Sequence, residues 1–375
     1  MTGRPTGHPG RPAGGVQVRS AMSADAAEIH RLVVAAFRSR PPLDPPADAL
    51  SETPESIAAE IGARGGLVAT RNGTPVGSLL FGTGPGLRLT RVSVDPAQRR
   101  QRVAGSLVRA AEAVAADRSE PTVSLVARRE LASTGAFWRS LGYGEVDPAS
   151  FPQVDRRPHN LTLARAVPFP VQVAGAAAMR RLGHRLANLL AAGDLVLLDG
   201  DLGAGKTTLT QGIGAGLGVR GPVTSPTFVL AREHPSLVGG PPLVHVDGYR
   251  LAGATELGDL DLDTAAAVTV VEWGRGLAES LAPDRVQITI DRDAALGTGA
   301  DAATPAGAPH PDAEPDDADA DADADANADA NADADANADA GDELRTVRVD
   351  AVGGRWALAG LRRALDQAGT PASLG

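Results

Sequence analysis

The chain has 375 residues, no cysteine and a formal net charge of −10. The length accommodates two ordinary domains, the missing cysteine excludes disulfides and thiolate metal sites, and no apolar run approaches the roughly 18 residues of a membrane span. Residues 1–15 are rich in Gly, Pro and Arg without an apolar core, so we expect a disordered leader and no secretory signal. These features predict a cytoplasmic protein.

The negative charge is concentrated in one segment. Residues 296–342 hold 13 Asp and one Glu with no Lys or Arg. Subtracting these fourteen charges from −10 leaves +4 for the remainder. The rest of the chain is therefore mildly basic, which permits an RNA or nucleotide partner without requiring one.

The first predicted domain covers residues 16–167. A strand is expected at 16–19 and a helix at 24–38, and Asn72-Gly73 between two apolar runs predicts a hairpin. The hairpin strands, the next strand and the next helix are expected at 66–70, 76–80, 87–94 and 104–116.

The segment after the strand at 87–94 favours binding of a pyrophosphate. Arg99 to Ala104 form a loop at the start of a predicted helix, where backbone N–H groups attract anions. Residues 92–107 resemble the acetyl-CoA motif of GNAT N-acetyltransferases, and 137–143 resemble that family's later helix-to-strand element. The resemblance implies a GNAT-like α/β domain over 16–167, with acetyl-CoA bound by Val94, Arg99, Arg100, Gln101, Arg102, Val103 and Ala104.

Three positions depart from the family pattern R/Q-x-x-G-x-G/A and its catalytic residues. Arg102 takes a Gly position, Leu131 stands where Asn is common, and Trp138 stands where many members have a Tyr general acid. An indole cannot act as that acid. Arg102 would either block approach of the backbone to the phosphates or supply its own guanidinium. Two hypotheses stay open: an active acetyltransferase, or a degenerate domain kept for folding or partner contact.

The second predicted domain covers 168–375, after a Pro-rich boundary at 168–170. Of 36 basic residues only Lys206 is a lysine, and it lies in a segment that matches G-x-x-x-x-G-K-[ST]. A compact ammonium suits the gap between two phosphates better than a planar guanidinium. Backbone N–H groups of such a loop cradle phosphates, and the hydroxyl that follows the lysine binds Mg²⁺.

The flanks of this loop support a nucleotide site over a chance Gly-rich turn. An apolar run at 195–198 predicts a buried parallel strand, and residues 207–217 have helical spacing that ends near Gly218. The helix N-terminus then directs its dipole at the bound anion.

Two carboxylates end later strands. Asp247 closes a strand at 243–247, and Glu272 closes one at 268–272 and precedes Trp273. Ligands of open α/β sheets bind at the carboxyl ends of the strands. Both acids are therefore candidates for the metal, the alternative for each being a helix cap or a surface charge.

Four ordered motifs, at 200–208, 225–228, 245–251 and 271–273, make the region 170–290 with 345–356 similar to the TsaE family. The resemblance implies a P-loop NTPase fold, with Mg²⁺ held by Thr207 and Glu272 and with Asp247 nearby. Lys206, Thr207, Asp247 and Glu272 are the implied catalytic residues, and 225–227 is an implied switch loop. The implied ATP contacts are Gly200, Asp201, Leu202, Gly203, Ala204, Gly205, Lys206, Thr207, Thr208, Thr227, Trp273 and Arg345.

Two features depart from that family. Gly248 stands where Leu is common, and the acidic segment lies directly before Arg345. The family's activity would be ATP hydrolysis that drives the TsaB–TsaD pair in N6-threonylcarbamoyladenosine modification of tRNA, next to the anticodon, with tRNA contacted through the complex. A P-loop alone does not specify this. A small-molecule kinase, for which no Arg-rich lid is evident, and a non-enzymatic ATP-binding assembly factor remain alternatives.

Asp-Ala and Asn-Ala repeats fill residues 313–340. Such a tract buries little apolar area and repels itself, so we expect a disordered insertion over 296–342. A calcium site is the alternative, but the glycine spacing of calcium loops is absent. The insertion is expected to join neighbouring strands at 286–290 and 345–349, the second alternating like an edge strand, because long loops add little closure entropy.

Overall fold

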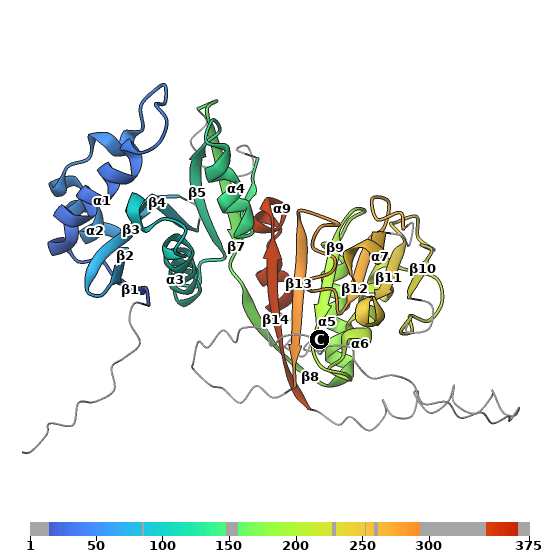
Figure 1. The fold of residues 1–375 in the computed structure, drawn as a ribbon. Coiled ribbons are helices and arrows are strands. Elements are labelled where there is room, and N and C mark those ends of the chain that lie inside the picture. The colour runs from blue at the N-terminus through green and yellow to red at the C-terminus, as the bar shows by residue number, and fades with distance from the viewer. Residues whose placement is uncertain are drawn as a thin grey trace, which may run out of the picture.

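The computed structural model describes residues 15–84, 86–147, 157–226, 230–251, 253–258, 262–292 and 343–366. It contains two seven-stranded sheets that follow one another along the chain (Figure 1). The predicted α/β class is therefore confirmed. Residues 1–14 of the expected leader and the whole 296–342 segment lie outside the described residues.

The first sheet has the order β1-β2-β3-β4-β5-β7-β6. Its elements are β1 (Gln17–Ser20), α1 (Ala26–Arg38), α2 (Pro54–Arg64), β2 (Gly66–Arg71), β3 (Thr74–Gly82), β4 (Leu87–Val94), α3 (Val103–Asp117), β5 (Thr122–Arg128), α4 (Ala132–Ser140), β6 (Gly144–Glu145) and β7 (Asn160–Ala166). Helices α1 and α2 share one core with Val68 and Leu80, while α3 and α4 share another with Leu67 and Leu79. The alternation along β2 and β3 thus places a helical layer on each face.

Two local features shape this sheet. The predicted hairpin is confirmed, since Asn72 (φ 51°) and Gly73 (φ 80°) connect β2 to β3 in the left-handed conformation of a type I′ turn. Strands β4 and β5 are parallel and pair only from Leu87–Leu89 against Val123–Leu125. Both strands continue beyond that pairing, so they separate toward their carboxyl ends.

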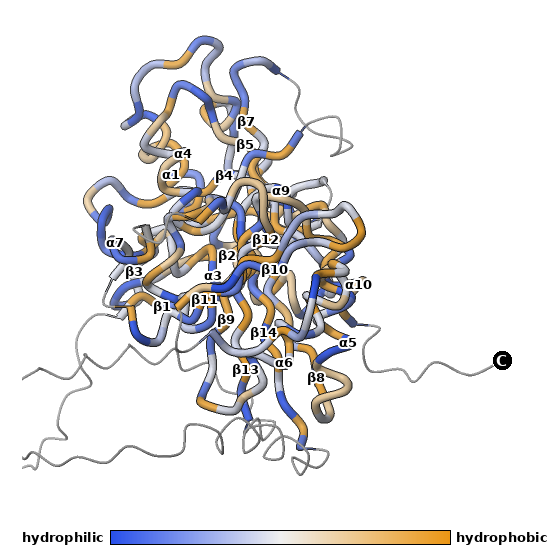
Figure 2. The backbone as a smooth tube through the Cα atoms, turned by 90° about the vertical axis from the view of Figure 1, so that its right-hand side faces the viewer, coloured by the Kyte–Doolittle hydropathy of each residue, from blue (hydrophilic) through white to orange (hydrophobic). Residues whose placement is uncertain are grey.

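The second sheet has the order β10-β11-β12-β9-β13-β14-β8. Its elements are β8 (Phe169–Ala174), α5 (Gly175–Ala187), β9 (Leu195–Asp199), α6 (Lys206–Leu217), β10 (Ala231–His234), β11 (Leu243–Asp247), α7 (Ala254–Gly258), β12 (Val268–Glu272), β13 (Arg285–Asp291), β14 (Leu344–Val352), α9 (Gly354–Leu358) and α10 (Leu361–Asp366). The four central strands β11, β12, β9 and β13 are parallel. Hydrophobic stretches follow the strands in Figure 2, as expected for a sheet buried on both faces.

One expectation about this sheet was wrong. Strands β13 and β14 are neighbours, as predicted, but β14 is not the edge strand because β8 pairs with its outer side. Segment 169–174 alternates between buried and exposed residues, which is the pattern of a strand with one face exposed. The Pro-rich composition of 168–170 concealed this strand.

The carboxyl end of β14 and helix α9 connect the two sheets (Figure 1), with α9 lying against β6 and β7. Arg165 of β7 forms ion pairs with Asp350 of β14 at 2.6 Å and with Glu112 of α3 at 3.1 Å. At the same junction the N–H of Gly353 donates to the carbonyl of Gly142 at 2.9 Å. The last part of the chain therefore packs on the first sheet as well as the second.

No helix in the described ranges is both long enough and apolar enough to cross a membrane.

Candidate functional site

A glycine-rich loop connects β9 to α6 at the carboxyl edge of the second sheet. Gly200 (φ 138°), Gly203 (φ 72°) and Gly205 (φ 112°) adopt conformations that favour glycine. A Cβ atom on Gly200 would lie 2.5 Å from the carbonyl oxygen of Ile290. The loop therefore needs glycine here both for its backbone angles and for close packing. The strand, loop and helix follow one another as predicted.

Lys206 starts helix α6 and is only 4% exposed. Its Nζ donates to the carbonyls of Gly200 at 2.7 Å and Asp201 at 3.0 Å, and it lies 3.7 Å from the ring centroid of Trp273. Burial lowers the pKa of Lys206 below its usual value, while nearby carboxylates, with Glu272 first among them, oppose the shift. The ammonium is thus held in the loop by weak carbonyl acceptors that a phosphate would outcompete.

Glu272 lies next to the residue that follows the lysine. Its Oε1 accepts a hydrogen bond from Thr207 Oγ1 at 2.9 Å and lies 2.9 Å from Nε2 of His245. Because an ionised carboxylate only accepts, Nε2 of His245 is the donor in this pair. His245 is fully buried, and no partner among the described residues reaches its Nδ1.

Asp247 and Glu272 are register partners at the ends of the parallel strands β11 and β12. Both side chains are buried, at 6% and 4% exposure. Asp247 Oδ1 accepts from the N–H of Tyr249 at 3.0 Å, so this acid also caps a short turn. The ring centroids of Tyr249 and Trp273 are 5.5 Å apart, and both residues line the same cavity as the two acids.

A cavity of about 580 Å³ brings these groups together. Arg345 lines it from β14, although it is distant in sequence, and donates to the carbonyl of Glu343 at 3.1 Å. Thr227 lies outside the described residues. The predicted residues on the cavity wall are Leu202, Gly203, Gly205, Lys206, Thr207, Thr208, Asp247, Glu272, Trp273 and Arg345. Gly200, Asp201 and Ala204 belong to the loop without lining the cavity.

The donor set suits a magnesium–nucleotide ligand. The described part of the chain holds no cluster of three or more His, Asp or Glu side chains arranged for a metal ion. Mg²⁺ prefers few protein ligands, keeps several waters and takes its other oxygens from phosphates. The hydroxyl of Thr207 and the carboxylates of Glu272 and Asp247 fit that preference.

A second cavity, of about 800 Å³, opens in the first sheet where β4 and β5 separate. Val94, Arg99, Arg100, Arg102, Val103 and Ala104 line it as predicted, at the N-terminus of α3. Gln101 does not line it, because its side chain accepts a hydrogen bond from Arg71. The predicted acetyl-CoA loop therefore faces this cavity with all but one of its residues.

The three departures from the GNAT pattern all lie on this cavity. Arg102 is left-handed (φ 61°), the conformation that glycine adopts without cost. Leu131 and Trp138 are buried. The nearby phenol of Tyr143 donates to Glu112 at 3.1 Å, and burial raises its pKa well above the usual value. Tyr143 is not among the described residues that line the cavity.

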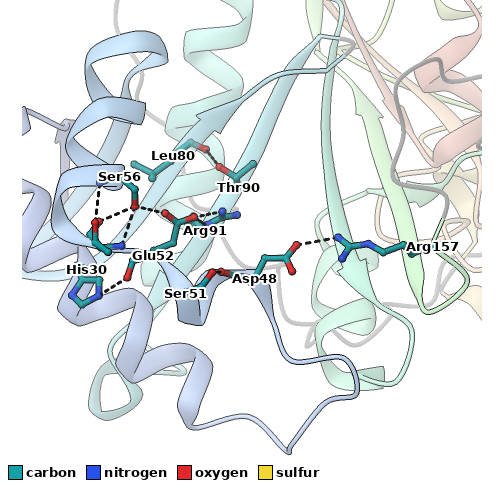
Figure 3. Close-up of polar contacts among 10 residues, drawn as sticks. His30, Asp48, Ser51, Glu52, Ser56, Leu80, Thr90, Arg91 and Arg157 are labelled. Carbon is teal, nitrogen blue, oxygen red and sulfur yellow. Dashed lines mark hydrogen bonds and ion pairs between the residues drawn. The ribbon is translucent and has the colours of Figure 1, made fainter.

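Figure 3 shows a polar network at the rim of this cavity that the sequence did not reveal. Arg91 of β4 pairs with Glu52, and Arg157 pairs with Asp48 at 3.1 Å.

Around the nucleotide site, sequence reasoning missed the pairing of His245 with Glu272. Its position two residues before Asp247 on a strand, which places both side chains on one face, was the signal available.

The fold and the cavity at its carboxyl edge define a P-loop protein. Comparison with known families agrees. The model "Threonylcarbamoyl adenosine biosynthesis protein TsaE" matches residues 173–298, and "Acetyltransferase (GNAT) family" matches residues 26–143. A TsaE protein of Streptomyces coelicolor is 65% identical over 126 residues, which are 33% of this chain and 84% of that protein. A TsaE protein of Bacillus subtilis is 45% identical over 103 residues, 27% of this chain and 63% of the other. The chain belongs to the TsaE family and carries a GNAT domain before the TsaE region.

Solved structures also show partial similarity to this chain. Bacillus subtilis YdiB covers 52% of this chain and 95% of its own, with 26% identity and a TM-score of 0.33. The PaiA N-acetyltransferase of Thermoplasma acidophilum, solved with coenzyme A, covers 40% of this chain and 99% of its own, with 13% identity and a TM-score of 0.35.

Proposed function

We propose that this chain hydrolyses ATP as part of the N6-threonylcarbamoyladenosine modification of tRNA, at the adenosine next to the anticodon. The observation that supports ATP hydrolysis is the meeting of Lys206, Thr207 and Glu272 in one cavity. The relatives named above are threonylcarbamoyladenosine biosynthesis proteins, which supports the pathway. We place the activity in the cytoplasm, where tRNA is modified.

Each side chain has a separate task in this proposal. Lys206 exchanges its loop carbonyls for phosphate oxygens, and Thr207 and Glu272 hold Mg²⁺ with Asp247 beside it. His245 fixes the orientation of the Glu272 carboxylate through its Nε2–H. Bound Mg²⁺ supplies positive charge on the phosphate oxygens. Arg345 adds a second cation from β14.

The proposed partners are TsaB and TsaD, with tRNA contacted through their complex. The test is ATP turnover by the full chain alone and with TsaB–TsaD, scored together with modified tRNA. Turnover that rises with the partners and is needed for modification supports the proposal. Modification that survives without turnover would favour the non-enzymatic assembly factor, and phosphate transfer to a small molecule would favour the kinase.

A second activity is favoured by the cavity of the first sheet. We propose two functional domains, 16–167 and 168–375, with acetyl-CoA bound by the first between the separated ends of β4 and β5. The test is equilibrium binding of acetyl-CoA to the full chain carrying Lys206→Ala, which removes the competing phosphate site. No binding would leave the first domain as a scaffold.

A further inference from the structure

Two arginines from different elements meet on one wall of the 800 Å³ cavity. Arg40 follows the end of α1, and Arg99 precedes α3. Arg99 donates to the carbonyl of Ala36 at 3.3 Å and to the hydroxyl of Ser39, so it is fixed to the C-terminal end of α1. The guanidinium of Arg40 lies 3.8 Å from the ring centroid of Phe37, which holds it on the same helix end.

Neither guanidinium has a carboxylate partner within the described ranges. Among the described residues that line the cavity, the only acid is Asp48, which pairs with Arg157, while Glu52 pairs with Arg91 (Figure 3). Burial and the nearby Arg99 lower the pKa of Arg40 to about 10, so Arg40 stays charged at neutral pH. Arg40 is half-buried and Arg99 is exposed. Burial removes part of the water around the Arg40 guanidinium, and an anion in the cavity would take the place of that water.

We propose that Arg40 and Arg99 form an anion-binding subsite that takes a phosphate or carboxylate group of a ligand in this cavity. Arg40 belongs to none of the motifs recognised in the sequence, whereas Arg99 begins the loop before α3 that is predicted to bind acetyl-CoA. The planar fork of each guanidinium matches an oxyacid group. Two sources present such a group, coenzyme A itself and a second, acidic ligand such as an acetyl acceptor.

The test uses the full chain with Lys206→Ala, so that phosphates do not occupy the loop of the second sheet. Arg40→Gln is compared with Arg38→Gln, a control that removes one charge from the same helix end, at an exposed position outside the cavity. Titration with coenzyme A measures the affinity. We expect Arg40→Gln to lower it roughly tenfold and Arg38→Gln to lower it less than about twofold. Arg40→Lys, which keeps the charge and loses the fork, is expected to be intermediate and serves if Arg40→Gln does not fold.

Two further probes separate the sources. If the parent and Arg40→Gln bind dephospho-coenzyme A with equal affinity, the subsite holds the 3′-phosphate. If Arg40→Gln loses as much affinity for dephospho-coenzyme A as it loses for coenzyme A, the subsite holds the pyrophosphate. If coenzyme A is unaffected or does not bind, but stabilisation of the melting temperature by inorganic phosphate is lost in Arg40→Gln alone, the anion comes from a second ligand. That last result leaves the subsite standing even where the acetyl-CoA proposal fails. Equal responses of Arg40→Gln and Arg38→Gln to both coenzyme A and phosphate overturn the inference.

Discussion

The two cavities hold their cations in opposite ways. In the second sheet one lysine is buried in a loop shaped by glycines, and Glu272, Asp199, Asp247 and Asp201 all act on it. In the first sheet the wall carries several arginines, and Arg40, Arg99, Arg100 and Arg102 contact no carboxylate in the described part of the chain.

The cavity of the second sheet therefore suits one ligand geometry. The cavity of the first sheet attracts anions without fixing their geometry as closely. A lysine fixed between two carbonyls offers a single point charge at one position, so a small displacement should be costly. Arginines on flexible stems can reach a phosphate from several directions. We therefore expect single substitutions to have large effects in the cavity of the second sheet and graded effects in the cavity of the first sheet.

The largest effect should come from Lys206→Ala. We expect affinity for ATP to fall about 1000-fold, or ~4 kcal/mol, because a buried charge pair loses its cation. Equilibrium binding of a labelled ATP analogue measures this, and Arg220→Ala at an exposed position outside the cavity is the control. Equal affinity in parent and mutant would remove the contrast between the cavities.

Glu272→Gln should lower Mg²⁺-dependent turnover about 100-fold, ~2.7 kcal/mol, while ATP still binds. The amide keeps the shape and loses the negative charge that faces Thr207 and the metal. Steady-state turnover across Mg²⁺ concentrations, with the melting temperature as a folding control, gives the answer. Normal turnover would move the metal acid to Asp247.

Arg165→Ala tests the junction between the two regions. Removing this partly buried cation leaves Glu112 and Asp350 without their shared partner, and we expect the free energy of unfolding to fall by about 2 kcal/mol. Burial raises the pKa of Glu112. The folded state therefore holds this proton more tightly than the unfolded state, and stability should fall as the pH rises from the usual Glu pKa of about 4.3 through the raised value.

Denaturant unfolding of the parent and of Arg165→Ala, followed from pH 4 to 8, measures both the loss of unfolding free energy and its dependence on pH. The difference should be largest at the upper end, where Glu112 is ionised and has lost its cation. A difference that is independent of pH would show that Glu112 does not titrate with folding.

Arg102→Gly should strengthen acetyl-CoA binding roughly threefold, because glycine adopts φ near 60° without strain and lets the backbone approach the phosphates. Calorimetry on the full chain with Lys206→Ala is the measurement. Weakened binding would instead make Arg102 a phosphate ligand and would favour an active acetyltransferase.

The smallest effect is expected from deletion of residues 313–340. The tract contains no Val, Ile, Leu, Met, Phe, Trp or Tyr, so it has little apolar area to bury. The melting temperature and ATP turnover should change little, since β13 and β14 pair along Arg285–Asp291 without it. Loss of folded protein would assign the tract a structural role.

Local patterns in the sequence determined much of this molecule. The spacing G-x-x-x-x-G-K-T between an apolar run and a helical run fixed the phosphate loop, and Asn72-Gly73 fixed a hairpin, because both depend on backbone conformations that only a few residue types adopt. Asp247 and Glu272 were placed correctly at strand ends because each is the charged residue that closes a short apolar run. That they are register partners at one cavity depended on the parallel pairing of β11 with β12.

Tertiary structure alone decided the contacts between distant segments. β8 became the edge strand because β14 offered it a partner, Arg345 reached the nucleotide cavity through the same sheet, and α9 packed across to the first sheet. Arg40 and Arg99 lie far apart in sequence and met only because α1 packs beside the loop before α3. Such contacts depend on packing and charge between elements, which no spacing along the chain encodes.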